Sequence, residues 1–282
     1  MIYEIKSKVA VAKFNSFGAE LISLNAYGEE KLWQNKDGKW GGHSPVLFPV
    51  CGHVAFIYDG KSYDVPAHGF AMKKEFSLVK QKKSEIEFSL KSDEETLKIY
   101  PFKFDFRVKY TLKKSTLNIE YKVINLDDKT LYFACGGHES FALNGVSDEY
   151  KLKFNCDEIF VNYCNDDNGY LTCKTEILGQ GNELILQDKY FEQALSLIFK
   201  DLSSKKVKLI KGEKHIAEIS FKGFNVLLAW KEYASEFICI EPWRNLPDCV
   251  IGASDTIENK YGFVAVKKGK VKKLSQNIKY FA

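Results

Sequence analysis

Four short segments interrupt the strand-like alternation of this chain and gather glycine, proline, histidine and carboxylate residues: 41–53, 66–71, 136–141 and 237–244. Four of the five histidines lie in the first three segments, and a glutamate lies in the last: His43, His53, His68, His138 and Glu241. Histidine titrates near neutral pH, and a carboxylate can accept or return a proton beside it. A histidine with a carboxylate is the smallest set of groups that general acid–base catalysis needs, and proton transfer on a neutral substrate fits that set.

Other kinds of catalytic site are weighed against this one. A metal site stays open as an alternative, because His43, His53 and His68 could converge in space although neither HxH nor HExxH occurs. A serine hydrolase lacks its G-x-S-x-G elbow, and Gly136-Gly137 is not part of a phosphate-binding G-x-G-x-x-G. We therefore expect proton chemistry with no metal and no catalytic cofactor.

The elements that must position these residues are expected to be β-strands. Apolar residues alternate over 102–112, and a second alternating run over 117–123 predicts a hairpin with the first. Asp59-Gly60 has the composition of a two-residue type I′ hairpin turn. Further strands are predicted at 9–14, 20–24, 85–90, 206–210 and 216–221, and the best helical candidate is the short segment 188–193.

The fold class that follows is all-β, a large antiparallel β-sandwich. No linker, low-complexity segment or repeat divides the sequence, so we expect one domain over residues 1–282. With 45% hydrophobic and 28% charged residues, the chain has the composition of a globular protein with a sizeable core.

The net charge and the cysteines limit which classes of partner and which cellular compartment are expected. The charge of +4 comes almost entirely from lysine, with Arg107 and Arg244 the only arginines, so we expect no nucleic-acid partner. The densest basic run, residues 267–273, is interpreted as a solvated hairpin turn around Gly269. The seven cysteines never form CxxC, and no leader or run of 18 apolar residues occurs, which predicts a cytoplasmic protein without a membrane partner. Monomer and homodimer both remain open.

Taken in order, the four segments resemble the aldose 1-epimerase, or galactose mutarotase, family, and in particular its LacX-like bacterial branch. The matching phrases are H-x-P-V-L-F-P-x-x-G at 43–52, H-G-F-A at 68–71, G-G-H at 136–138 and E-P-W at 241–243. The similarity extends over nearly the whole chain, from Phe17 to Tyr280. It implies a galactose mutarotase-like supersandwich with an open cleft that binds a sugar.

The resemblance also implies roles for individual residues. Glu241 would remove the proton from the anomeric O1 hydroxyl while His138 protonates the ring oxygen, so that the ring opens and recloses as the other anomer. His68 would hydrogen-bond the sugar near its ring oxygen. Apart from the resemblance, Trp243 could either offer the sugar a flat apolar surface or be a core tryptophan. Glu241 needs a raised pKa for this work, for which partial burial beside its apolar neighbours is a suitable environment.

Two positions depart from the family pattern, and both concern the choice of substrate. The family commonly has an arginine that reaches the sugar hydroxyls where this chain has His53. The family's carboxylate for the distal hydroxyls has no clear counterpart, and the nearest candidate is Gln193.

Three functions consequently remain. The first is a mutarotase for a free hexose such as galactose or glucose. The second is a hexose-6-phosphate epimerase, which needs cations for the phosphate, from lysines or from Arg244. The third is a sugar-binding protein of the same fold without turnover, since fold alone does not imply function.

Overall fold

The computed structural model describes residues 1–249 and 255–282, and β-strands dominate it. The alternating runs form β10 (Phe104–Lys113) and β11 (Thr116–Asn125), which pair antiparallel with Leu112 opposite Leu117. Every second residue of β11 is buried, as the alternation predicts. The predicted hairpin is confirmed, and so is the all-β fold class.

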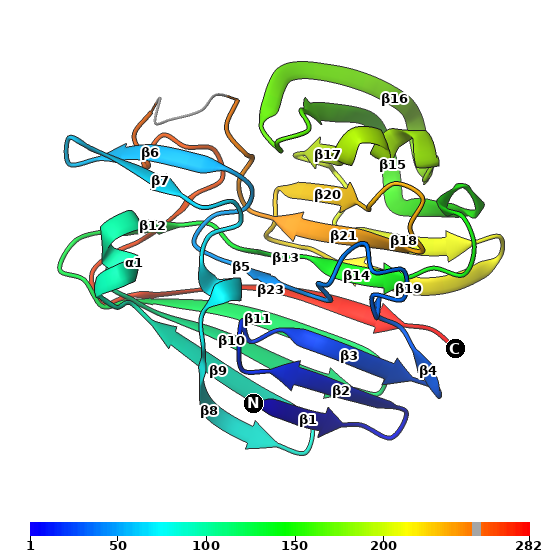
Figure 1. Ribbon diagram of the computed structural model, residues 1–282, viewed down its shortest axis with the longest axis horizontal. Helices are drawn as coiled ribbons and strands as arrows, with labels where there is room; N and C mark the ends of the chain where they lie inside the picture. Colours follow the sequence, from blue (N-terminus) through cyan, green and yellow to red (C-terminus); the bar gives the residue numbers. More distant parts are fainter. Residues whose placement is uncertain (250–254) are drawn as a thin grey trace.

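Among the described residues, fifteen strands form one large antiparallel sheet (Figure 1). Its hydrogen-bonded order is β5-β13-β21-β20-β17-β15-β18-β19-β23-β11-β10-β9-β8, with β14 also paired to β21 and β16 to β15. The strands not yet delimited are β5 (Val46–Leu47), β8 (Ser77–Lys82), β9 (Glu85–Lys91), β13 (Gly136–Gly137), β14 (Glu139–Ala142), β15 (Tyr150–Asn165), β16 (Leu171–Ile185), β17 (Leu197–Lys200), β18 (Lys206–Lys211), β19 (Lys214–Ser220), β20 (Val226–Trp230), β21 (Phe237–Trp243) and β23 (Val271–Tyr280).

Smaller elements cover parts of this sheet. They are a sheet of β1 (Ile2–Lys6), β2 (Ala10–Asn15), β3 (Leu21–Ala26) and β4 (Glu29–Glu30), the pairs β6 (Val54–Tyr58) with β7 (Lys61–Val65) and β12 (Leu131–Phe133) with β22 (Val264–Val266), the helix α1 (Glu94–Ile99) and the 3₁₀ helices η1 (Ala71–Lys73), η2 (Ser147–Glu149) and η3 (Asp188–Ala194). None of the helices that the structure describes is both long and apolar enough to span a membrane.

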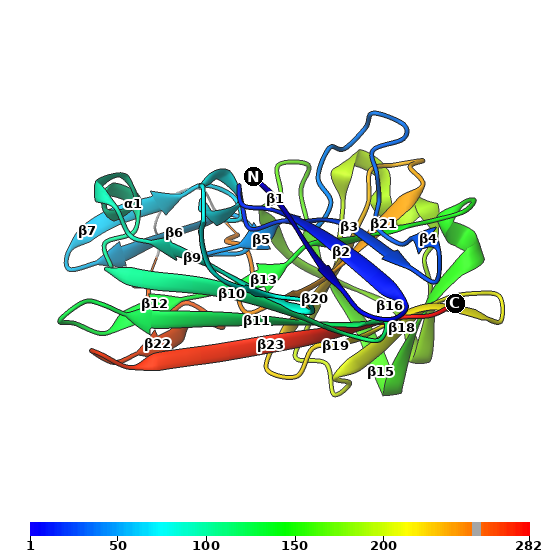
Figure 2. The ribbon, with the colours of Figure 1, turned by 90° about the horizontal axis from the view of Figure 1, so that it is seen from below.

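The N-terminal sheet packs on the β9–β10 part of the large sheet, and the two layers are seen edge-on in Figure 2. The ring of Phe14 from β2 lies 4.5 Å from that of Tyr110 on β10, and Tyr3 meets Phe88 edge-on at 5.5 Å. The Tyr110 hydroxyl donates to the Ala19 carbonyl at 2.8 Å, so this buried polar group is satisfied.

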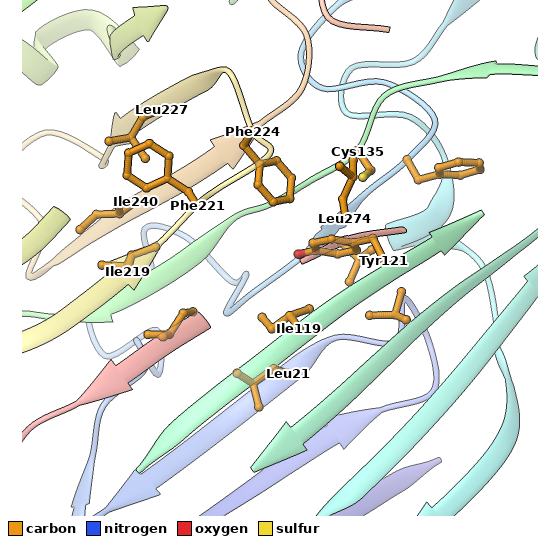
Figure 3. Packing of buried hydrophobic residues seen from close by; sticks show 14 of the residues in the cluster. Leu21, Ile119, Tyr121, Cys135, Ile219, Phe221, Phe224, Leu227, Ile240 and Leu274 are labelled. Atoms are coloured by element: carbon orange, nitrogen blue, oxygen red, sulfur yellow. The ribbon is translucent and has the colours of Figure 1, made fainter. Parts of the chain in front are cut away.

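The core brings together strands from both halves of the large sheet. In Figure 3, Ile119 of β11 and Ile219 of β19 lie in the same cluster as Leu227 of β20, Ile240 of β21 and Leu21 of β3. The large sheet therefore bends around its core, and β21 is anchored against that core through Ile240, which is fully buried. The alternate face of β21 carries Cys239, Glu241 and Trp243, because side chains alternate along a strand.

Several local predictions have clear outcomes. Asp59 and Gly60 have φ of 49° and 69° between paired β6 and β7, which confirms the two-residue turn. Residues 267–273 do turn, with Lys270 N–H donating to the Lys267 carbonyl, but the hairpin prediction was wrong. The strands on either side pair elsewhere, β22 with β12 and β23 with β11, so the turn joins two sheets.

The helical predictions were less accurate. The segment 188–193 lies in η3, which is a 3₁₀ helix broken by non-helical backbone at Glu192 and Gln193. The helix α1 was not predicted. It is held by a capping box in which the Thr96 N–H donates to the Asp93 carboxylate and the Asp93 N–H donates to the Thr96 hydroxyl oxygen. Six residues are too few for a visible helical period.

Candidate active site

A cleft of about 420 Å³ opens where β20, β21 and the β13–β14 junction meet the loops at 40–53, 66–72 and 165–169. All five residues predicted for the catalytic and sugar-binding site line it: His53, His68, His138, Glu241 and Trp243. The strand framework therefore gathers residues that are far apart in the sequence.

His138 and Glu241 face each other at the floor of the cleft. His138 lies between β13 and β14, Glu241 lies in the middle of β21, and Nε2 of the imidazole is 3.5 Å from Oε1 of the carboxyl group. Glu241 is completely buried and His138 is 9% exposed. The Trp243 indole donates to Glu241 Oε2 at 3.1 Å, whereas Oε1 has no partner among the described residues. The carboxyl group is thus held by one oxygen and left free at the other.

The two glycines before His138 are required by close packing. A Cβ on Gly136 would come within 2.6 Å of both the Pro242 carbonyl oxygen and the Trp243 ring. A Cβ on Gly137 would lie 2.2 Å from the carboxyl group of Glu139. Only glycine lets β13 approach β21 closely enough to place His138 opposite Glu241.

Aromatic rings rather than hydrogen bonds orient the His138 imidazole. Trp40 stacks on it with centroids 5.1 Å apart and planes at 22°, while Trp230 and His68 meet it edge-on at 5.6 and 5.7 Å. Within the described part of the chain Nδ1 has no hydrogen-bond partner. Trp40 and Trp230 were not singled out from the sequence. In the structure a Cβ on Gly42, two residues after Trp40, would sit 2.4 Å from the Trp40 ring, so glycine is needed there.

His68 is held as a hydrogen-bond donor. The Gly52 N–H donates to its Nδ1 at 3.1 Å, which leaves the proton of the neutral ring on Nε2. The next residue, Gly69, has φ of 77° and passes so close to the Phe48 carbonyl that a Cβ would lie 2.0 Å from its oxygen. This fixed turn explains the His-Gly phrase in the sequence.

Burial sets the protonation of the central groups. Desolvation, reinforced by His68, lowers the pKa of His138 to about 3. Desolvation, reinforced by Glu139, raises the pKa of Glu241 well above its usual range, against the opposing hydrogen bond from Trp243. The pKa of His68 falls to about 4, again chiefly through burial. Burial therefore favours the uncharged form of the empty pair, a carboxylic acid beside a neutral imidazole, which together carry one titratable proton.

Glu139, directly after His138, is a second buried acid that points away from the cleft. Burial raises its pKa to about 8, and the Gln276 amide donates to its Oε1 at 2.6 Å. The same amide nitrogen also donates to the hydroxyl of Tyr121 at 3.1 Å. Glu139 is consequently a neutral carboxylic acid in the folded protein at pH 7.

This placement predicts a pH-dependent stability that Glu139→Gln removes. Between pH 5 and pH 8 the unfolded carboxyl group ionises while the folded one keeps its proton, so rising pH destabilises the wild type. At about 1.36 kcal/mol per pKa unit, its free energy of unfolding should fall on the order of 4 kcal/mol further than that of the variant. Urea unfolding at both pH values measures the difference, and parallel pH dependences would show that Glu139 is ionised in the fold.

His53 lies on the cleft wall and has its own support. Its ring stacks on Tyr170 with centroids 4.4 Å apart and planes at 18°. A Cβ on Gly169 would be 3.5 Å from the imidazole, an ordinary van der Waals distance, so the loop after β15 lies beside the ring. The short ring thus stands where the resemblance implies an arginine, and it is held in the wall instead of reaching across the cleft.

Three alternatives left open by the sequence are narrowed by the structure. His43 is outside the cleft lining, with Nδ1 3.8 Å from the Glu20 carboxylate, so His43, His53 and His68 do not line one site. Gln193, the nearest candidate for the distal polar group, is exposed at the break in η3 and does not line the cleft. Trp243 is only 2% exposed and donates to Glu241, so its role is closer to that of a core tryptophan that holds the carboxyl group than to that of an apolar surface.

Polar groups from other loops line the outer cleft instead: Asn165, Asp167, Asn168, Ser196 and Glu232. For Asn165, Asp167 and Asn168 the signal was the turn-rich sequence of residues 165–170, where Asp166 accepts from two backbone N–H groups of its own loop. Among the described lining residues none is a lysine or an arginine. Arg244 points elsewhere and donates to the carbonyls of Gly223 and Gly262. The ionisable groups of the outer cleft are therefore acidic.

Comparisons with known proteins find similar sequences and similar folds. The family model described as aldose 1-epimerase matches residues 1–256. Protein LacX (chromosomal) of Lactococcus lactis subsp. lactis is 30% identical over 268 residues, covering 87% of this chain and 88% of that protein. A galactose mutarotase related enzyme from Lactobacillus acidophilus superposes with a TM-score of 0.91 at 30% identity, over 100% of this chain and 98% of its own. A galactose mutarotase-like protein from Lactobacillus casei ATCC 334 gives 0.92 at 25% identity, with full coverage of both chains.

Proposed function

The chain belongs to the aldose 1-epimerase family, and from that premise we propose that it interconverts the α and β anomers of a neutral hexose. The observation that carries the proposal is the buried pair His138–Glu241, whose facing atoms are 3.5 Å apart at the floor of the cleft. The anomeric carbon bears both O1 and the ring oxygen O5. Two groups this close can therefore contact both oxygens of one anomeric centre.

The reaction needs one proton acceptor and one proton donor at the same moment. Glu241 removes the proton of the O1 hydroxyl, the C1–O5 bond breaks, and His138 delivers a proton to O5. Rotation about C1–C2 presents the other face of the aldehyde, and reclosure with the roles reversed gives the other anomer. One proton leaves the pair and one returns in each half, so the pair keeps a single proton throughout.

That single proton matches the balance set by burial. In the empty cleft the neutral arrangement is favoured, with the proton on Glu241. For Glu241 to begin as the acceptor, the proton crosses the 3.5 Å gap to His138 when a sugar hydroxyl approaches the carboxyl group. The Nε2–H of His68 can then donate to the sugar near its ring oxygen, which supports the same pose.

The acidic outer cleft favours an uncharged substrate over a phosphorylated one. Asp167 and Glu232 would repel a phosphate, and the described lining has no lysine or arginine to bind it. We expect the catalysed rate for galactose or glucose to exceed that for the corresponding 6-phosphate by at least ~10-fold, or 1.4 kcal/mol.

Exchange NMR on the four sugars, with and without protein, tests this proposal. Faster exchange of the 6-phosphates would favour the phosphate-specific function. Binding without any acceleration would favour a sugar-binding protein.

A further inference from the structure

Cys239 lies beside the pair that the proposed function uses, but it has no part in that function. It precedes Glu241 by two residues on β21, so both side chains project from the same face of the strand. Its thiol, His138 and Glu241 each offer one ligand atom, and the three atoms lie within 4.8 Å of one another. Cys239 is completely buried and does not line the cleft, so the thiol sits beneath the cleft floor.

These three groups match the ligand chemistry of borderline divalent ions. Zinc binds thiolate sulfur at about 2.3 Å and imidazole nitrogen or carboxylate oxygen at about 2.0 Å, with four ligands in a tetrahedron. Ligand atoms of such a site are about 3.5 Å apart, which the His138–Glu241 pair already satisfies. Sulfur and nitrogen ligands disfavour magnesium and calcium, which require oxygen.

A second observation points to an occupant. Glu241 Oε1 is buried and has no hydrogen-bond partner among the described residues, and it lies 3.5 Å from Nε2 of His138. The other oxygen of the carboxyl group is fixed by the Trp243 indole, the kind of outer contact that orients a metal ligand. A free buried oxygen is costly unless something binds it.

We propose that His138, Cys239 and Glu241 form a site for a borderline divalent ion such as Zn²⁺, with the fourth coordination position open to the cleft. Binding releases the thiol proton of Cys239 and the carboxyl proton of Glu241 and leaves a thiolate–metal and a carboxylate–metal bond, with no change of oxidation state. The bound ion takes Nε2 of His138 and Oε1 of Glu241. If the pair is catalytic as proposed above, the ion is a reversible inhibitor, a consequence that rests on the proposed function while the binding itself does not.

Cadmium binding tests the site through the ultraviolet charge-transfer absorption of a cadmium–thiolate bond. Cys173 and Cys249 are exposed and in hydrogen-bond contact, so they are first replaced by serine to remove a competing thiol pair. In this background one equivalent of Cd²⁺ should produce the band, and Zn²⁺ should displace it. The further change Cys239→Ser should abolish it, whereas Cys164→Ser, a half-buried cysteine elsewhere, should leave it unchanged.

Glu241→Gln provides a second test that keeps the thiol. It should weaken cadmium binding by about 10-fold or more, since even the loss of outer contacts costs about 10–100-fold. The metal site is overturned if the Cys173→Ser/Cys249→Ser protein shows no band, or if the band survives the further change Cys239→Ser. If anomer exchange is detected, Zn²⁺ should suppress it in the wild type, and a chelator should restore it. The exchange catalysed by the Cys239→Ser variant should be less sensitive to Zn²⁺. If exchange is not detected, the cadmium band still decides the metal site by itself.

Discussion

Glu241→Gln should slow catalysed anomer exchange by about 10²–10⁴-fold, the usual contribution of a positioned acid or base. Glutamine has the same shape as glutamate but cannot accept a proton. Its amide oxygen can still accept the hydrogen bond from the Trp243 indole N–H, so the local packing should be preserved. Because Glu241 is fully buried and its pKa is raised by burial, a neutral amide should not destabilise the fold. Polarimetry of freshly dissolved α-D-galactose gives the rates.

The matched control is Glu139→Gln, another completely enclosed glutamate that faces Gln276 instead of the cleft. This variant should keep an activity within about tenfold of the wild type, because Glu139 contacts neither proposed proton-transfer atom. Loss of a catalytic acid or base would cost about 10²–10⁴-fold. Thermal unfolding of both variants separates chemistry from folding. Wild-type activity in a folded Glu241→Gln protein would remove Glu241 from the mechanism.

His138→Gln should have the second large effect, again about 10²–10⁴-fold. Nε2 of His138 is the other atom facing the anomeric centre, and the nearer Trp243 indole, 3.1 Å from Oε2, is not an acid–base group at neutral pH. Because the two residues act as one unit, the double variant with Glu241→Gln should be scarcely slower than either single variant. The rates are measured as for Glu241.

His43→Gln is the histidine control for this prediction. The His43 side chain lies beside Glu20 outside the cleft lining, so its loss should leave the rate unchanged. Multiplicative losses in the double variant would mean that His138 and Glu241 contribute separately, contrary to the proposed transfer of a single proton between them.

Many strands could be predicted from the sequence because they have one solvent-facing side and one buried side. The alternation that marks β10 and β11 is a direct consequence of that geometry, and the Asp59-Gly60 turn follows from the positive φ that both positions need. The turn at Gly269 was wrongly predicted to close a hairpin. The composition of a turn is the same whether its flanking strands pair with each other or, as here, with distant strands.

The cleft was predictable only in part. Motif resemblance brought His138 and Glu241 together, since nothing in their local sequence requires the pairing between β13, β14 and β21. Trp40 was missed because its contact with His138 is made by a loop, and loop geometry depends on distant packing. Gln193, the nearest candidate for the distal hydroxyls, lies outside the cleft for the same reason, because a break in η3 leaves its side chain exposed.

The most direct test of the central claim is the rate at which α-D-galactose and α-D-glucose reach anomeric equilibrium with the wild-type protein. Polarimetry or NMR follows the approach to equilibrium from freshly dissolved sugar. We expect acceleration proportional to protein concentration for at least one of these hexoses, and its loss in Glu241→Gln. An unaccelerated rate with both sugars, from protein that is folded, would contradict the proposed epimerase.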